Sequence, residues 1–243
     1  KGNMDITGGR IAGGKIDSIA KAAEGSTSTG KATVQAYGGN FYITDDATVK
    51  MTGGTVIGGS VKHNSQAGAT TALGGNFCVA GTGSLEVTGG QILDGVSSYR
   101  GGNVIVWDEA SATLTGDVLI SGGNATNGSN AAVQNASALL LVDGSARLID
   151  PKGKNSVYAA GGGKLEMRGG TVTGGLTVSA HAGNAQFAMY GGYVETLSKT
   201  EALPVTQVTL YNGKLGSDPA GQATVAQCAC YLPDGDGAYI VWH

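Results

Sequence analysis

The sequence predicts an all-β chain, a right-handed single-stranded parallel β-helix of about eight coils with a C-terminal capping hairpin. Three observations predict this fold class. Glycine supplies 44 of the 243 residues, whereas an average chain has roughly 7% glycine. A unit of about 22 residues recurs along the chain, and apolar residues alternate with polar ones inside it. Collagen is excluded, because glycine lacks a period of three and proline is scarce.

The repeat is complete in three segments, at 38–59, 74–95 and 101–122. A shorter template, MTGGTVIGG in the first of them, marks each coil, and its first glycine position falls at 8, 53, 89, 116, 143, 169, 191 and 212. The intervals exceed the unit length mainly in the first half of the chain. We therefore expect inserts at 15–37 and 60–73, which emerge from one corner of the coil.

Alignment of the copies produces apolar columns, and a spacing of two positions predicts strands with one buried face. Each coil then holds about three short strands, near 41–44, 48–52 and 55–57 in the first complete copy. Since one coil cannot bury its apolar face, the coils must stack. The expected buried columns are Met4, Val49, Leu85, Ala112, Leu139, Leu165, Phe187 and Val208; Ile6, Met51, Val87, Leu114, Leu141, Met167, Met189 and Leu210; and Ile11, Val56, Ile92, Leu119, Ala146, Val172, Val194 and Leu215.

The segments outside the regular coils have their own signals. In DSIAKAAEG, Asp17 or Ser18 is suited to cap a short helix that ends at Gly25. The tail ATVAQCACYL-PDGDG-AYIVW predicts a hairpin that covers the last coil. We expect the β-helix over 1–215 and the capping segment over 216–243. The chain starts inside the repeat pattern and shows no N-terminal capping segment, so we expect an N-terminally truncated β-helix.

The glycine-pair template and the stacked columns resemble the pectin-lyase-like β-helix superfamily, and most closely glycine-rich surface and adhesin repeat proteins of Gram-positive bacteria. The resemblance covers roughly residues 1–215. It implies an extracellular location, on the bacterial cell surface or secreted. It also implies a ladder of side-chain hydrogen bonds along a turn column; a simple turn preference of asparagine is the alternative. The column contains Asn40, Asn76, Asn103, Asn130 and Ser156.

In enzymes of this superfamily, the strand at 41–44 would present clustered carboxylates on its outer face, often with calcium. The expected outward positions contain no Asp, Glu, Lys, Arg or His, so no catalytic residue can be transferred. We predict no catalytic site, no metal site and no cofactor. The outward positions are Tyr42, Cys78, Ile105, Ala132 and Tyr158, with Thr44, Ala80, Trp107, Gln134 and Ala160.

Large apolar side chains on this face predict a ligand-binding surface formed by Tyr42, Trp107 and Tyr158 and rimmed by Tyr99 and Arg100. Flat aromatic rings suit stacking against sugar rings or contact with an apolar partner. The alternative is burial, because the two long inserts could fold over the same face.

Acid pairs at one turn, Asp45–Asp46 and Asp108–Glu109, lie two coils apart. From the coil spacing they should be roughly 10 Å apart, too far for one calcium ion without help from loops. We interpret them as solvated turn carboxylates.

The three cysteines predict no disulfide framework. Cys78 is expected to pack under a loop. Cys228 and Cys230 stand two positions apart on one strand, where a disulfide would be strained. Free thiols and this disulfide both remain open.

These features together predict a non-catalytic extracellular binding or adhesion module of a bacterial cell-surface protein that recognises a glycan or a host protein. The 15 basic and 18 acidic residues create no attraction to nucleic acid. No apolar run reaches the roughly 20 residues that span a membrane. The alternatives are a carbohydrate-active β-helix enzyme, lyase or hydrolase, and a structural stalk or filament unit. End-to-end self-association through exposed strand edges would build the stalk.

Overall fold

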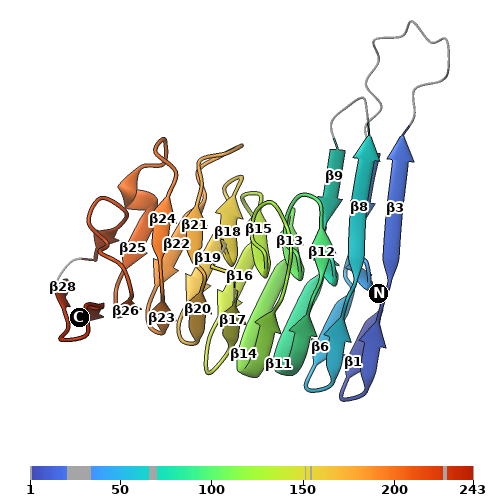
Figure 1. Ribbon diagram of the computed structural model, residues 1–243, viewed down its shortest axis with the longest axis horizontal. Helices are drawn as coiled ribbons and strands as arrows, with labels where there is room; N and C mark the ends of the chain where they lie inside the picture. Colours follow the sequence, from blue (N-terminus) through green and yellow to red (C-terminus); the bar gives the residue numbers. More distant parts are fainter. Residues whose placement is uncertain are drawn as a thin grey trace, which may run out of the picture.

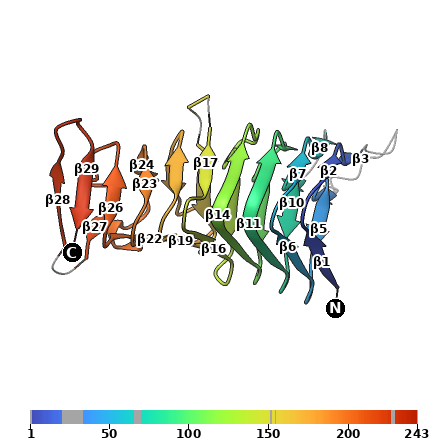
Figure 2. The same ribbon diagram turned by 90° about the horizontal axis from the view of Figure 1, so that it is seen from below.

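The computed structural model describes residues 2–20, 34–65, 70–150, 152–153, 155–226 and 229–242, and over these residues the chain is all-β. Its strands follow one another in sequence order along the long axis of the molecule, and the two ends of the chain lie at opposite ends of that axis (Figures 1 and 2). Within the described ranges, the one helical element is the 3₁₀ turn η1 (Val205–Gln207). The all-β prediction is confirmed.

The largest sheet has 17 strands, which lie in two rows. In the first row each strand pairs in parallel with the strand one repeat later. This row contains β1 (Asn3–Ile6), β6 (Thr48–Met51), β11 (Ser84–Leu93), β14 (Ser111–Ser121), β16 (Leu139–Val142), β19 (Lys164–Met167), β22 (Gln186–Met189), β25 (Val208–Leu210) and β27 (Thr224–Val225).

The second row of this sheet is also parallel until the C-terminal hairpin. The long strands β11 and β14 run through both rows. At the end of the row, β29 pairs antiparallel with both β26 and β28, so the predicted hairpin is present and continues this sheet. The row contains β2 (Arg10–Ala12), β7 (Thr55–Ile57), β17 (Arg147–Ile149), β20 (Thr171–Thr173), β23 (Tyr193–Val194), β26 (Gly213–Leu215), β29 (Tyr239–Trp242) and β28 (Cys230–Pro233).

A seven-stranded sheet faces the large one, and all its pairings are parallel. The core lies between these two sheets and consists of the inward side chains of both. The strands, in spatial order, are β5 (Phe41–Ile43), β10 (Phe77–Val79), β13 (Val104–Trp107), β15 (Ala131–Gln134), β18 (Val157–Ala160), β21 (Leu176–Val178) and β24 (Leu197–Lys199).

The two inserts and the segment after β11 contain strands of their own. β3 (Lys15–Ala20), β8 (Ser60–Ser65) and β12 (Val96–Ser97) form a three-stranded parallel sheet, and β4 (Val34–Tyr37) pairs in parallel with β9 (Thr70–Leu73). The helix expected from Asp17 or Ser18 is therefore wrong, because both residues lie in β3. Six consecutive pairings with β8 outweigh the local helix signal. Gly25, its expected end, lies outside the described residues.

The predicted buried columns are confirmed in most coils, where their members lie in the core. Two members in the first coil differ. Met4 in β1 is 44% exposed, and Ile11 in β2 is only partly buried. Both belong to the first strands of their rows, which have a neighbouring strand on one side. Fewer neighbours leave more of each side chain in water.

The prediction was wrong by one residue in β16. Leu140 pairs with Ala112, and Val142 pairs with Leu114. The side chains of Leu140 and Val142 are buried. The expected core residues Leu139 and Leu141 are instead partly exposed. The sequence Leu-Leu-Leu-Val contains no polar residue, so its alternation carries no information about register.

A second one-residue shift follows a bulge. Between Val87 and Gly89 the pairing of β11 with β14 changes register, since β14 has one more residue there. As a result Ile120, rather than the predicted Leu119, is the core residue that pairs with Ile92. In the next strand Leu148 pairs with Ile120, two positions after the predicted Ala146, which is itself buried in the core.

The hydrogen-bonded ladder at the turn before the seven-stranded sheet is confirmed. Each Nδ2 donates to the next side-chain oxygen, with distances of 2.7, 2.7, 3.1 and 3.0 Å from Asn40 through Asn76, Asn103 and Asn130 to Ser156. The same amides bind the backbone. For Asn103, Oδ1 accepts the Gly95 N–H at 2.8 Å and Nδ2 donates to Ser121 O at 2.9 Å. The ladder thus joins the turns of five consecutive coils.

Candidate ligand-binding surface

The outer face of the seven-stranded sheet has the side chains that the sequence predicted for it. Register places Tyr42, Cys78, Ile105, Ala132 and Tyr158 side by side in one row. Trp107 starts a second row, followed by Gln134 and Ala160. The predicted outward positions that these pairings contain are therefore correct, and Ala80 belongs to the same outer cluster.

A second layer covers much of this face. Leu73 from β9 packs on it, and parallel bridges join Leu73 to Arg100 and Arg100 to Asn127. Cys78 and Ile105 beneath this layer are fully buried, and Tyr158 is 7% exposed. Burial, the alternative left open by the sequence, is therefore correct for this part of the face. The expectation that Tyr158 would be available to a ligand is wrong.

Arg100 binds the second layer to the sheet. Its guanidinium carbon lies 4.5 Å from the ring centroid of Tyr99 and 5.3 Å from that of Tyr158. Its Nη1 donates a hydrogen bond to Gln134 Oε1. The side chain is 1% exposed and its Nε has no hydrogen-bond partner in the structure. The expectation that Arg100 would form an accessible rim is therefore wrong; cation–π contacts hold it inside.

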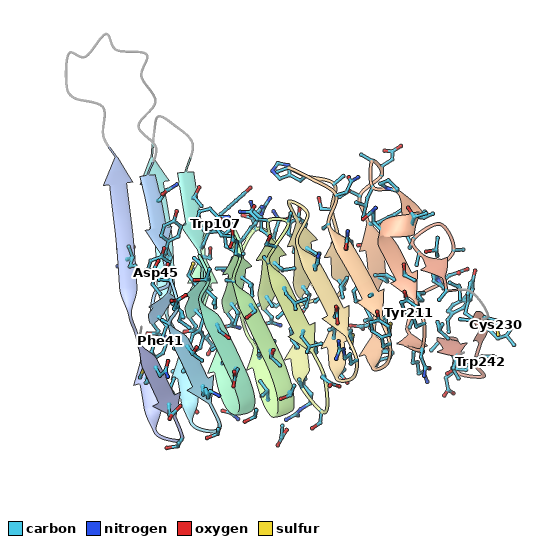
Figure 3. All side chains as sticks on the ribbon, turned by 180° about the vertical axis from the view of Figure 1, so that it is seen from behind. Phe41, Asp45, Trp107, Tyr211, Cys230 and Trp242 are labelled. Atoms are coloured by element: carbon cyan, nitrogen blue, oxygen red, sulfur yellow. The ribbon has the colours of Figure 1, made fainter. Side chains whose placement is uncertain are left out.

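Three aromatic side chains remain at the margin of this covered area, and we call them the aromatic platform: Tyr37, Tyr42 and Trp107. Tyr42 is 48% exposed. Its ring stacks on Tyr37 with centroids 5.2 Å apart and planes 17° apart, and Tyr37 lies 5.3 Å from Trp107 at 41°. Tyr99 and Trp107 are half-buried. Two of the predicted ligand residues, Tyr42 and Trp107, thus belong to one cluster. Trp107 lies in the N-terminal half of the molecule (Figure 3).

Tyr37 is the member that sequence reasoning missed, although a signal was available. Tyr37, Leu73 and Arg100 each precede a Gly-Gly-Asn triplet. They pair with one another across consecutive coils, so they form one more column. A column aligned on these triplets would have placed all three over the sheet.

Four carboxylates border the platform at the next turn. Asp45 and Asp108 have left-handed backbones, with φ of 56° and 61°, a conformation that Asp tolerates better than most residues. Asp108 Oδ1 accepts a hydrogen bond from Asn135 Nδ2 at 2.8 Å, and Asp46 Oδ1 accepts one from Thr82 Oγ1 at 3.2 Å. Asp45, Asp46 and Glu109 are exposed. The carboxylates therefore shape the turn and give the platform an acidic rim.

Metal and thiol chemistry find little support at this surface. In the described ranges, no group of three or more His, Cys, Asp or Glu side chains is placed to hold a metal ion. Cys78 is buried, and that burial, with the charge of Asp108 as a smaller cause, raises the pKa of its thiol. Cys230 is exposed, whereas Cys228 lies outside the described residues.

The alkaline stability of the protein is expected to depend on Tyr37. Burial, and then the neighbours Tyr42, Cys78 and Asp108, raise its pKa from 10.0 to about 12. Between these pH values the unfolded chain loses the Tyr37 proton before the folded protein does, so stability falls as pH rises. We expect Tyr37→Phe to make the drop in denaturation midpoint between pH 9.5 and 11.5 smaller, on the order of what one titrating group causes. Equal drops in both proteins would contradict this assignment.

The chain matches no protein-family model, no curated protein and no solved structure. The resemblance to the pectin-lyase-like superfamily therefore stays a prediction. Within the part of the chain that the structure describes, no helix has the length and apolar character of a membrane span.

Proposed function

We propose that this chain is a non-catalytic, extracellular binding module of a bacterial surface or secreted protein, and that it recognises a glycan. The observation that carries the proposal is the aromatic platform, in which the exposed ring of Tyr42 stacks on Tyr37 beside Trp107. The proposed location follows from the sequence resemblance.

We also propose the finer architecture, a right-handed single-stranded parallel β-helix over residues 1–215 with a capping segment over 216–243. Supporting it, each pass of the chain from β5 to β26 contributes a strand to both rows of the large sheet and one to the seven-stranded sheet. The asparagine ladder connects equivalent turns of consecutive passes. Such a stack is a stiff support for a binding surface.

The chemistry of the platform favours a sugar over other small ligands. A pyranose ring has an apolar face of C–H groups and a rim of hydroxyls, which match an aromatic surface beside hydrogen-bond acceptors. Asp45 and Asp46 supply exposed acceptors at the adjacent turn. Their negative charge disfavours acidic glycans, because like charges repel. The proposed ligand of the platform is therefore a neutral glycan.

Rigidity is a second argument for binding at this place. Tyr42 lies in β5, whose backbone pairs with β10, and Trp107 lies in β13 two strands away. Side chains fixed by a sheet lose little conformational entropy when a ligand binds. A preformed platform of this kind needs no rearrangement to present its rings.

A glycan array of neutral and acidic oligosaccharides tests the proposal. We expect neutral members to bind, and Tyr42→Ala and Trp107→Ala each to weaken the binding at least tenfold, because aromatic anchors dominate such contacts. Trp242→Ala is the matched control. Trp242 is 41% exposed but lies in the C-terminal hairpin, where Leu232 and Ile240 are exposed as well.

The outcomes separate the possibilities. Unchanged binding in both platform variants would reject this site. An equal loss in Trp242→Ala would point to unspecific apolar contact through the hairpin, the place where end-to-end self-association would also occur. Folding of each variant is checked by its denaturation midpoint.

A further inference from the structure

A second surface lies on the outer face of the large sheet, towards the C-terminal end. Register aligns Lys164 with Gln186, and Glu166 with Ala188 and Thr209. Tyr190 directly follows β22 and Tyr211 directly follows β25, and each takes the next outward position after Ala188 and Thr209, respectively. Together these side chains form a grid of three rows, which are Lys164, Glu166 and Arg168; Gln186, Ala188 and Tyr190; and Gln207, Thr209 and Tyr211.

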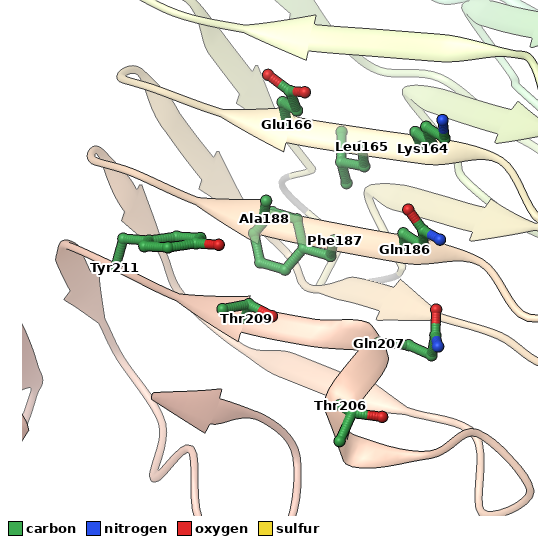
Figure 4. Close-up of a pocket in the computed structure, with 10 residues that line it drawn as sticks. All are labelled: Lys164, Leu165, Glu166, Gln186, Phe187, Ala188, Thr206, Gln207, Thr209 and Tyr211. Carbon is green, nitrogen blue, oxygen red and sulfur yellow. The ribbon is translucent and has the colours of Figure 1, made fainter. Parts of the chain in front are cut away.

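The centre of this grid is its smallest side chain, Ala188, and a groove lies over it. The groove has a volume of about 310 Å³, near the lower end of the roughly 300–1,000 Å³ found for small-molecule sites. Figure 4 shows Tyr211 on one side of Ala188 and Gln186 and Gln207 on the other. The hollow arises because larger residues surround an alanine on a flat sheet.

One wall of the groove is aromatic. Tyr190 and Tyr211 stack with centroids 4.5 Å apart and planes 11° apart. Tyr190 is 43% exposed even though its ring is one of a stacked pair. Tyr211 is half-buried and lines the groove, whereas its stacking partner Tyr190 is not part of the lining.

The other walls carry hydrogen-bonding groups. Gln186 and Gln207 have side-chain amides, Thr209 has a hydroxyl, and all three line the groove. Glu166 is paired with Arg168 at 2.9 Å. Lys164 also lines the groove, and among the described residues its ammonium forms no ion pair. The groove thus combines side-chain amides and a hydroxyl on one side with Tyr211 on the other, whose hydroxyl points towards Ala188 (Figure 4).

We propose that this groove is a second sugar-binding site, distinct from the aromatic platform. One pyranose ring would lie over Ala188, and its hydroxyls would exchange hydrogen bonds with Gln186, Gln207 and Thr209 and with the hydroxyl of Tyr211. Amides and hydroxyls suit this role, since each can donate and accept. Tyr211 and the platform residue Trp107 lie towards opposite ends of the molecule (Figure 3), so the two sites would bind separately.

Filling the groove is the sharpest test, because it removes none of the proposed contacts. We expect Ala188→Arg to place a long side chain in the hollow and to weaken binding at least tenfold. Thr113→Arg is the matched control, since Thr113 has the corresponding outward position in β14, away from the groove. Tyr211→Ala should weaken binding similarly.

The probes are oligosaccharides of glucose, galactose, mannose and N-acetylglucosamine, titrated into ¹⁵N-labelled Tyr42→Ala protein. In this background the platform is disabled, so failure here is distinguishable from failure of the proposed function. Shifts of the Gln186 and Gln207 side-chain amide signals that saturate, and that disappear in Ala188→Arg but not in Thr113→Arg, are the expected result. Absence of these shifts with every probe, or their survival in Ala188→Arg, would overturn the proposal.

Discussion

Asn103→Ala is expected to lower the free energy of unfolding by about 2 to 5 kcal/mol, because each buried polar group left without a partner costs ~1–3 kcal/mol. The side chain is fully buried. Its removal leaves the Gly95 N–H without an acceptor and takes away the acceptor of one Asn76 Nδ2 hydrogen. It also removes the donor to Ser121 O. The change is measured as a shift of the urea denaturation midpoint followed by circular dichroism.

Asn103→Asp separates hydrogen bonding from lost volume. Aspartate has nearly the same shape and can still accept from Gly95, but it cannot donate to Ser121 or Asn130. We expect it to destabilise the protein as well, since a buried carboxylate without a cationic partner is unfavourable. Asn184→Ala, at an exposed turn, is the control and should shift stability by less than about 0.5 kcal/mol. Equal effects at Asn103 and Asn184 would mean that the ladder contributes nothing.

Gly75→Ala is the second substitution with a large expected effect, about 3 kcal/mol, because an added methyl group in a packed interior cannot be accommodated. A Cβ at this position would lie 2.1 Å from Gly102 O and 2.3 Å from Val96 N. Both atoms belong to the backbone of neighbouring segments, so no side-chain rotation can relieve the clash. We expect a lower thermal midpoint and a loss of soluble protein.

Gly8→Ala is the matched control for this glycine. A Cβ there would have no atom within 4 Å, and its backbone does not require a positive φ. Gly8→Ala should change the free energy of unfolding by no more than about 0.5 kcal/mol. A tolerated Gly75→Ala would show that the coils can separate locally to admit a methyl group, contrary to the packing described above.

Much of the fold could be predicted because the same pattern of apolar and polar residues recurs several times along the sequence. Each copy repeats the same alternation, so columns such as Val49, Leu85 and Ala112 were placed correctly from their spacing alone. The prediction was wrong where a copy lost its polar residues, as at Leu139–Val142, or gained a residue, as after Leu114. Register in a strand is a relative property, and a uniform sequence does not specify it.

The candidate site was harder to predict for a different reason. Alternation told which side chains of the seven-stranded sheet point outward, and Tyr42 and Tyr158 both do. It could not tell that a second layer covers Tyr158 and leaves Tyr42 exposed to water. That layer consists of insert strands and bridges that pair between coils. Whether an outward residue is accessible thus depends on tertiary pairing that the period of the sequence does not contain.

The asparagine ladder also has a direction. Every amide in it donates towards the C-terminal end and accepts from the N-terminal end, from Asn40 through to the Ser156 hydroxyl. No member can rotate its amide by half a turn alone, because two oxygens and two NH₂ groups would then face each other. The orientation of one amide therefore fixes the next, and aligned bonds of this kind polarise one another. The amides of the ladder therefore share one allowed orientation, although the repeats that they join differ in length and sequence.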